Sequence, residues 1–384
     1  MKPQLAFIDH SFHRKTKASS FLVEILKKEY EVEIFWDEAW RNGPRVDLKK
    51  IAESGYNPVV LFQVFRFPRE KIRFLRDRRV ILFPMFDACP VSTDFYWKNF
   101  TCLPDVRFIN FSEMLHRRIA RFGFHSKYFR YFLPVDETPR DKVDGRKLKG
   151  FFWQRTDRIT WNHIRTLISK ARFETFNIHA AVDPPGFRFV QPGAGEMTKY
   201  NIDITKWFSG REDYLRVVKE ANVFFAPRVN EGIGMAFLEA MAMGKCVVAP
   251  DSPTMNEYIT HGETGLLYDP KQPQPLDFSN IEDICANTRE LVAEGYKKWR
   301  QSREELLEFI KERAVPAAHE ETGDSIPDRN DERKYSSGRK GAMKLKMGTA
   351  LYFRYRQVIY NLKAFIKKCI PGAVKLLIRG KKVY

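Results

Sequence analysis

The stretch that decides the fold is Ala226-Pro-Arg-Val-Asn-Glu-Gly-Ile-Gly-Met-Ala-Phe-Leu-Glu-Ala240. The apolar residues before it predict a strand that ends at Ala226, and a helix is predicted to begin near Met235. Between them, Gly232 and Gly234 let the backbone approach a ligand closely. Free amides and the helix dipole at such a helix start favour a negatively charged group. The stretch therefore predicts a site for a nucleotide diphosphate.

Two glutamates frame this loop. Glu231 precedes the helix and is expected to reach into the ligand site, and Glu239 lies one turn beyond Met235 on the same helix face. Carboxylates placed in this way can accept hydrogen bonds from hydroxyl groups, one set on a sugar and another on a ribose. The alternative is that both glutamates only complement the helix N-terminus or face solvent.

Outward from this stretch, short apolar runs alternate with amphipathic ones. The runs predict strands at Leu5–Ile8, Glu31–Phe35, Val59–Gln63, Val80–Pro84, Val106–Phe111, Gly150–Trp153, Thr175–His179, Asn222–Ala226, Lys245–Ala249 and Gly265–Tyr268. Helices are predicted at Ser19–Tyr30, Pro68–Arg78, Ser112–Phe122, Trp161–Lys170, Arg211–Ala221, Gly234–Met243, Thr254–Thr260, Ile281–Ala293 and Tyr296–Arg313. This alternation predicts two Rossmann-like α/β domains, each with a parallel sheet covered on both faces.

Two such domains in succession predict a cleft between them. The charged stretch from Asp136 to Lys149 has no apolar periodicity and is the expected connection. We therefore predict domains at residues 1–140 and 141–315, a flexible linker at 316–341 and a tail at 342–384. Because open α/β folds bind ligands at the carboxyl ends of their strands, the cleft is the expected ligand site.

Composition and charge narrow the functional class. The five cysteines are scattered, without the spacing of a disulfide framework or a zinc site, and no apolar run is long enough to span a bilayer. These features predict a cytoplasmic protein. The net charge is +18, and fifteen Lys or Arg but no Asp or Glu follow Glu332. Most of the positive charge therefore belongs to the tail.

The tail pattern predicts a basic amphipathic helix, because its apolar residues recur at steps of three and four. These residues are Leu351, Tyr355, Val358, Leu362, Phe365 and Cys369. An apolar stripe flanked by cations suits anionic lipid headgroups, so we expect peripheral attachment to the inner face of the cell membrane. Packing back on the body is an alternative. Nucleic acid is not an expected partner, because no nucleic-acid module accompanies the charge.

A second block, Asn256-Glu-Tyr-Ile-Thr-His-Gly-Glu-Thr-Gly-Leu-Leu-Tyr268, follows the first. The spacing of Glu231 and Glu239, together with this block, resembles retaining glycosyltransferase family 4, the glycosyl transferases group 1 domain. The resemblance covers residues 150–315 well and the first half in layout only. Asn256 stands where the family usually has proline.

The resemblance implies a GT-B fold, in which the second domain binds a nucleotide diphosphate sugar and the first binds the acceptor. It assigns Glu231 to the donor sugar near the reacting carbon and Glu239 to the nucleotide ribose. The implied donor-binding residues also include Asn230, Gly232, Ile233, Gly234 and Met235. It further implies transfer of a hexose with retention, without a metal or other cofactor, which agrees with the lack of an Asp-x-Asp motif. The expected acceptor is a glycan or lipid-linked glycan in cell-surface polysaccharide or lipopolysaccharide synthesis.

The leaving diphosphate requires cations, because negative charge builds as it departs. Arg155 stands where the family places an arginine after the first strand of the second domain. Thr160 replaces the lysine that the family has five residues on, and Arg158 is the nearest cation. This departure keeps a catalytically silent GT-B subunit, binding a partner or a membrane, as an alternative. A nucleotide-sugar epimerase is another alternative of the same fold.

The acceptor side departs further from the family. Asp9-His-Ser-Phe-His-Arg-Lys-Thr-Lys17 replaces the glycine-rich loop that often follows the first strand. This places His10 and His13 at the cleft edge, although a surface histidine is more often merely solvated. The segment Phe83-Pro-Met-Phe-Asp87 stands where the family often has a His-Asp pair, and it keeps only the acid. His10, His13 and Asp87 are therefore the acceptor-side candidates.

Overall fold

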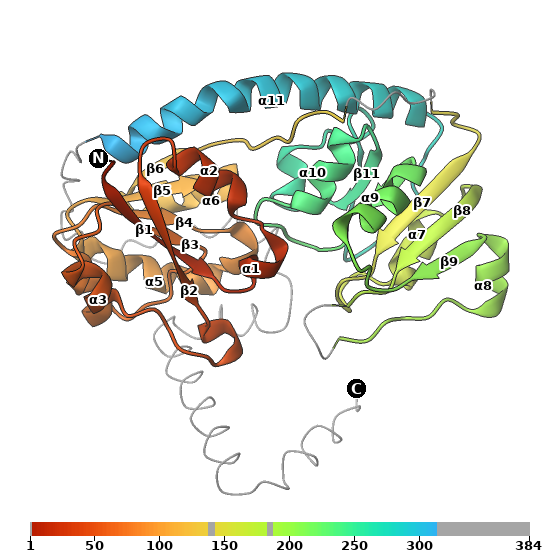
Figure 1. The fold of residues 1–384 in the computed structure, drawn as a ribbon. Helices are drawn as coiled ribbons and strands as arrows, with labels where there is room; N and C mark the ends of the chain where they lie inside the picture. The colour runs from red at the N-terminus through yellow and green to blue at the C-terminus, as the bar shows by residue number, and fades with distance from the viewer. Residues whose placement is uncertain (1, 137–142, 183–186, 313–384) are drawn as a thin grey trace, which may run out of the picture. The chain divides into compact units, whose positions relative to one another are not determined.

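The structure is a computed structural model that describes residues 2–136, 143–182 and 187–312 (Figure 1). These residues belong to one compact unit, Met1–Gly323. They form two six-stranded parallel sheets with helices between the strands, as the sequence predicts. The predicted linker at 316–341 and the basic tail at 342–384 lie outside the described residues.

The first sheet has the strand order β2-β1-β3-β4-β5-β6, and every neighbouring pair is parallel. Its strands are β1 (Gln4–His10), β2 (Glu31–Asp37), β3 (Val59–Phe62), β4 (Val80–Phe83), β5 (Val106–Asn110) and β6 (His125–Tyr128). The helices of this half are α1 (His13–Thr16), α2 (Ser20–Leu26), α3 (Leu48–Glu53), α4 (Arg69–Ile72), α5 (Asp94–Trp97) and α6 (Glu113–Ala120).

The second sheet has the order β12-β11-β10-β7-β8-β9, again parallel throughout. Its strands are β7 (Leu148–Trp153), β8 (Phe173–His179), β9 (Ile202–Thr205), β10 (Val223–Phe225), β11 (Cys246–Pro250) and β12 (Leu266–Tyr268). The helices of this half are α7 (Trp161–Leu167), α8 (Ala194–Lys199), α9 (Arg211–Glu220), α10 (Met235–Ala242) and α11 (Ile281–Lys311).

Both faces of each sheet are buried, because successive strand residues point to opposite sides. In β4, Val80 and Leu82 belong to one apolar cluster, and Ile81 and Phe83 belong to another. The cluster that holds Ile81 and Phe83 also contains Phe224 of β10. The two halves therefore share one apolar core.

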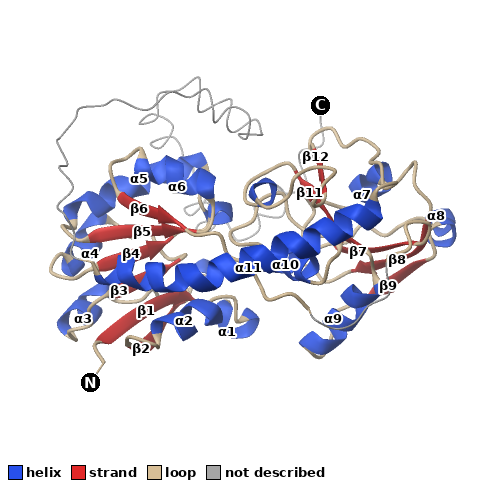
Figure 2. Cartoon of the chain, turned by 90° about the horizontal axis from the view of Figure 1, so that it is seen from above, coloured by secondary structure: helices blue, strands red, loops and turns tan. Residues whose placement is uncertain are grey.

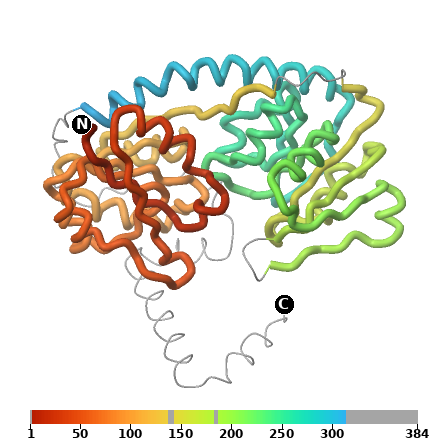
Figure 3. Tube along the Cα trace, viewed as in Figure 1, coloured from red at the N-terminus to blue at the C-terminus, as the bar shows by residue number. Residues whose placement is uncertain are grey.

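Helix α11 connects the two halves. Its first turns bury Ile284 against the second sheet, and its last turns bury Leu306 in the shared core. Trp299 packs its ring 5.1 Å from that of Tyr131 (centroid to centroid). The course of this helix across both halves is visible in Figures 2 and 3. The predicted domain boundaries at 140 and 315 are not separated by this packing and stay predictions.

Two buried or half-buried arginines of the first half hold the C-terminal end of α11. Arg107, fully buried on β5, donates hydrogen bonds to the carbonyls of Phe309 and Glu312. Arg79 donates to the carbonyls of Ile310 and Lys311 at 3.0 and 2.8 Å. These donors satisfy carbonyl groups that lack a partner within the helix and complement its dipole.

Several element predictions were wrong in extent. The two helices predicted at 281–293 and 296–313 are one helix, because Gly295 faces the ring of Phe132 and serves close packing instead of a break. The helix predicted at Thr254–Thr260 is a short 3-10 turn, Met255–Glu257. The helix predicted at Pro68–Arg78 is α4 followed by a 3-10 turn. Strands β6 and β9 and helix α8 were not predicted, because their polar, partly exposed sequences lack a clear apolar period.

Candidate active site

Strand order reverses once in each sheet. In the first sheet the reversal lies between β1 and β3, and in the second it lies between β7 and β10. Ligands of open α/β sheets bind outside the carboxyl ends of the strands at such points. His10 ends β1, Arg155 follows β7 and Glu231 follows β10. The sequence-predicted residues therefore flank both reversal points.

The loop after β10 is held from behind by the segment after β11. The fully buried Thr254 hydroxyl lies 2.9 Å from the carbonyl oxygens of both Glu231 and Gly232. Ser252 donates to the Asn230 side-chain oxygen at 2.6 Å. These bonds order the loop backbone, so the Glu231 side chain leaves it from a fixed point.

Arg228 lies between two carboxylates from different halves. Its Nη1 atom is 2.9 Å from Oδ2 of Asp87, after β4, and 3.5 Å from Oε2 of Glu231. Glu231 is buried, and this burial raises the pKa of its carboxyl, with Arg228 opposing the shift and Asp87 adding to it. The shared guanidinium joins the acceptor-side candidate Asp87 to the donor-side candidate Glu231.

Glycine is required at two positions of this loop. A Cβ atom at Gly232 would lie 2.9 Å from Oδ1 of Asp87 and 2.9 Å from Cβ of Met85. Gly234 has φ +84° and precedes α10, and a side chain there would overlap the Phe237 ring. Gly232 therefore permits the close approach of the first half, and Gly234 starts the helix with its amides free. The N-terminal amides of α10 include those of Gly234 and Met235, whereas the side chain of Ile233 is buried in the core.

Glu239 is also buried but has a different partner. Its Oε1 atom is 2.7 Å from Nη2 of Arg211, whose side chain is 65% exposed. Burial raises the pKa of the Glu239 carboxyl, and Arg211 opposes the shift. The cation of this pair comes from α9, within the same half of the chain.

Arg155 and Arg158 differ in their placement. Arg155 packs its guanidinium 5.2 Å from the ring centroid of Trp153 and is close enough to act on the pKa of Glu231. Arg158 is exposed, and no contact between its side chain and Glu231 or Glu239 occurs among the described residues. Thr160, which replaces the family lysine, is the N-cap of α7, and its hydroxyl is 3.2 Å from Nδ1 of His163. Arg158 is therefore not brought to the site beside Arg155.

The acceptor-side histidines lie at the end of β1. His13 places Nδ1 2.7 Å from Oδ1 of the fully buried Asp9, and Ser19 donates to Oδ2 of the same carboxylate at 2.5 Å. His10 stacks on Trp40 with ring centroids 5.0 Å apart, and burial, followed by the charge of His13, lowers the pKa of His10. Both histidines are thus held in place by their surroundings.

Contacts between the halves identify residues to which the sequence reasoning gave no role. Lys15 lies 4.8 Å from the ring centroid of Trp207, the residue that follows β9 by two positions. Glu257 accepts hydrogen bonds from the Ser112 hydroxyl at 2.8 Å and from the first amides of α6. Arg228, Arg211 and Asp9 were also missed. Arg228 and Asp9 stood inside quoted motifs, but their pairing partners are distant in sequence or depend on loop geometry.

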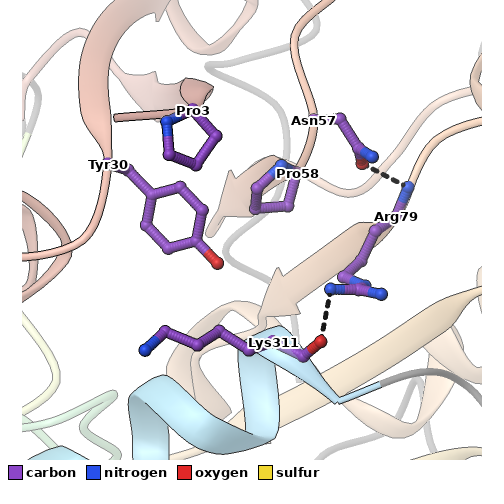
Figure 4. Close-up of a pocket in the computed structure, with 6 residues that line it drawn as sticks. All are labelled: Pro3, Tyr30, Asn57, Pro58, Arg79 and Lys311. Atoms are coloured by element: carbon purple, nitrogen blue, oxygen red, sulfur yellow. Dashed lines mark hydrogen bonds between the residues drawn. The ribbon is translucent and has the colours of Figure 1, made fainter. Parts of the chain in front are cut away.

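Two cavities lie away from these residues. The first, of about 190 Å³, is at the amino ends of β1, β3 and β4 (Figure 4). Its two cations are paired: Arg79 with Asp105, and Lys311 with Glu29. The second, of about 440 Å³, lies along α9 between Glu212 and Glu220. Because neither cavity is at a strand reversal, we place the candidate site by strand order and not by cavity size.

Two searches of the described residues bear on metal and membrane binding. They contain no group of three or more His, Cys, Asp or Glu side chains that could hold a metal ion. Within the same ranges, no helix combines the length and the apolar character needed to cross a membrane. The predictions of metal independence and of a peripheral membrane partner are not tested by these observations.

Comparison with known proteins agrees with this arrangement. Residues 196–291, which include both glutamates and the Asn256–Tyr268 block, match the family described as glycosyl transferases group 1. No match to a curated protein was found.

Several solved structures share the fold. Sucrose-phosphate synthase from Thermosynechococcus elongatus aligns with a TM-score of 0.56 and 16% identity, over 81% of this chain and 98% of that one. HepE from Anabaena, solved in complex with UDP, has a TM-score of 0.56 and 14% identity, over 79% and 100%. The trehalose-6-phosphate synthase OtsA has a TM-score of 0.54 and 9% identity, over 81% and 99%. The chain therefore has the predicted GT-B fold and carries a glycosyl transferases group 1 domain in its second half.

Proposed function

We propose that this protein is a retaining glycosyltransferase that moves a hexose from a nucleotide diphosphate sugar to a glycan or lipid-linked glycan. The observation that carries the proposal is the buried Glu231, at a strand reversal, within the segment that matches the family. HepE was solved with UDP-glucose, which makes a UDP-sugar the first donor to test.

The residues present suit a metal-free departure of the diphosphate. In this proposal the N-terminal amides of α10 and the guanidinium of Arg155 meet the phosphates, because both present positive charge near Glu231. Glu239 accepts hydrogen bonds from the ribose hydroxyls, exchanging them for its contact with Arg211. Glu231 holds the sugar near its reacting carbon.

A donor screen tests the proposal in two steps. Thermal unfolding of the full chain is measured with UDP-glucose, UDP-galactose, GDP-mannose, ADP-glucose and dTDP-glucose, and specific binding raises the apparent melting temperature. Release of the nucleotide diphosphate and formation of product are then followed for the donor that binds. Binding without any release, together with no effect of Glu231→Ala, favours the silent subunit. Conversion of the donor into an epimer favours the epimerase.

We further propose that the basic segment 342–384 attaches the enzyme to anionic membrane. The support is the sequence alone: fifteen Lys or Arg and no acid after Glu332, beside apolar residues at helical spacing. Full-length protein is expected to sediment with vesicles of phosphatidylglycerol and phosphatidylcholine, and a chain ending at Gly341 is expected to remain in solution. Equal sedimentation of both proteins would contradict the proposal.

A further inference from the structure

The end of β1 holds a carboxylate that accepts from three donors. Asp9 is fully buried, and its Oδ1 atom receives the backbone amide of His10 at 2.7 Å. Its Oδ2 atom receives the hydroxyl of Ser19 at 2.5 Å, and His13 contributes Nδ1 at 2.7 Å from Oδ1. Donors of this number stabilise the ionised form of a carboxyl group in the absence of water.

The ionised carboxylate determines the tautomer of His13. A carboxylate can only accept hydrogen bonds, so the Nδ1 atom of His13 must carry the proton that it shares with Asp9. The lone pair of the neutral ring is then on Nε2. No described residue forms a hydrogen bond with Nε2, and the side chain keeps 11% of its surface exposed. The ring therefore presents a basic nitrogen with a fixed orientation.

The position of this ring is at the candidate site. His13 begins α1, immediately after β1, whose carboxyl end borders the strand reversal of the first sheet (Figure 1). Its ring centroid is 5.7 Å from that of His10, whose pKa responds to the charge of Asp87. Asp87 in turn shares Arg228 with Glu231. Two residues beyond His13, Lys15 contacts Trp207 of the second half.

We propose that Nε2 of His13 takes the proton from the acceptor hydroxyl during sugar transfer, with Asp9 as the positioning residue. The inference rests on the proposed function. As the acceptor oxygen bonds to the anomeric carbon of the donor sugar, the bond from that carbon to the diphosphate oxygen breaks. The electron pair leaves with the nucleoside diphosphate, and the acceptor proton moves to Nε2. A base aligned in this way contributes about 10²–10⁴-fold to a rate.

Other charged groups surround the ring and must be separated from it. Asp9 and His10 come from β1, Arg14 and Lys15 from α1, and Asp37 and Asp87, which act on His10, follow or end other strands: Asp9, His10, Arg14, Lys15, Asp37 and Asp87. A structural role for Asp9 is the competing explanation, because the same carboxylate also fixes the turn through Ser19.

Four variants distinguish the base from the structural role. His13→Gln removes the base, and Asp9→Asn reverses the hydrogen bond that orients it. Ser19→Ala removes another donor to the same carboxylate without touching the ring, and His125→Gln is a histidine control on β6. Nucleotide diphosphate release is measured with UDP-glucose, GDP-mannose and ADP-glucose as donors, and octyl glucoside or water as acceptor, from pH 5 to 9. UDP binding by each variant reports whether the donor site is intact.

The expected result is a loss in kcat of about 10²-fold or more for His13→Gln and Asp9→Asn, with UDP binding unchanged. Wild-type kcat falls toward acid pH as the base is protonated, and His13→Gln lacks this acid limb. Ser19→Ala and His125→Gln keep both kcat and the limb. If Asp9→Asn fails to fold, His13→Gln decides alone.

The outcomes separate this inference from the proposed function. Transfer by His13→Gln at the wild-type kcat, with the acid limb intact, overturns the inference and leaves the glycosyltransferase in place. An equal loss of kcat in Ser19→Ala assigns Asp9 and His13 to the structure of the turn and also overturns it. A wild-type protein that releases nucleotide diphosphate from none of the donors contradicts both.

Discussion

The two glutamates of the candidate site are both buried, yet their cations come from different places. Glu231 shares Arg228 with a carboxylate of the other half, and this guanidinium is one-third exposed. Glu239 has Arg211 to itself, on a side chain that is two-thirds exposed. An exposed arginine can move away when a ligand arrives, whereas a shared one is held by two partners. The difference indicates a fixed centre at Glu231 and an exchangeable contact at Glu239.

The strongest way to break the comparison is to neutralise each glutamate in turn. We expect Glu231→Gln to lower kcat at least about 10²-fold, because it removes charge beside the reacting carbon. The measurement is product formation at saturating donor. Unfolding serves as a control, since a carboxyl with a raised pKa stabilises the fold fully below its ordinary value of 4.5 and less as pH rises through its folded pKa. Glu231→Gln is therefore expected to match wild-type stability in acid and exceed it at pH 8. Unchanged kcat would contradict the central role of Glu231.

A second test removes the shared cation. Arg228→Met leaves Glu231 and Asp87 together without a common partner, and we expect a loss of about 2 kcal/mol in unfolding free energy, below the usual cost for a fully buried pair because Arg228 is partly exposed. Chemical denaturation measures it. The pKa of Glu231 rises further in this variant, so the deficit widens as pH increases from 4.5. Arg216→Met, which breaks an exposed pair on α9, is the matched control. Equal stability of both variants would show that the shared pair carries no weight.

A third test addresses the exchangeable contact. Glu239→Gln is expected to raise the KM for the donor about tenfold with a smaller change in kcat, because ribose binding is the same in the ground and transition states. Steady-state kinetics with varied donor measure both constants. A fall in kcat as large as that of Glu231→Gln would remove the distinction between the two glutamates.

The smallest expected effect is that of Arg211. Arg211→Ala is expected to change unfolding free energy by less than about 1 kcal/mol, since its side chain is mostly in solvent. Donor binding, measured by calorimetry, is expected to stay within about threefold of wild type or to improve, because Glu239 is released for the ligand. Strong weakening of binding would show instead that Arg211 itself contacts the donor.

Some features of the fold were predictable because they are local. The strands announce themselves by buried apolar runs, and the loop around Gly234 by residue types that only a close approach or a positive φ requires. The pairing of Arg228 with Asp87 was not predictable, because 141 residues separate them and only the packing of the two halves brings them together. Gly295 misled the helix prediction for the same reason, since its role is defined by Phe132 across the interface.

The candidate site divides along the same line. Glu231 and Glu239 follow from their spacing, and their burial agrees with it. Arg158 was chosen by proximity in sequence, and an exposed loop residue is poorly placed by that criterion. Asp9 was quoted but given no role, because only the turn through Ser19 shows that its carboxylate faces inward.

The clamp on the end of α11 has a consequence for the order of folding. During synthesis, Arg107 emerges about two hundred residues before the carbonyls of Phe309 and Glu312 that receive its hydrogen bonds. Until those carbonyls arrive, closing the first sheet would bury a guanidinium that lacks two of its acceptors, which is costly. The first half is thus not an independent unit on the ribosome, and its sheet reaches the final packing only when the end of α11 returns to it. A glycosyltransferase truncated before residue 309 would lose its acceptor half as well as its last helix.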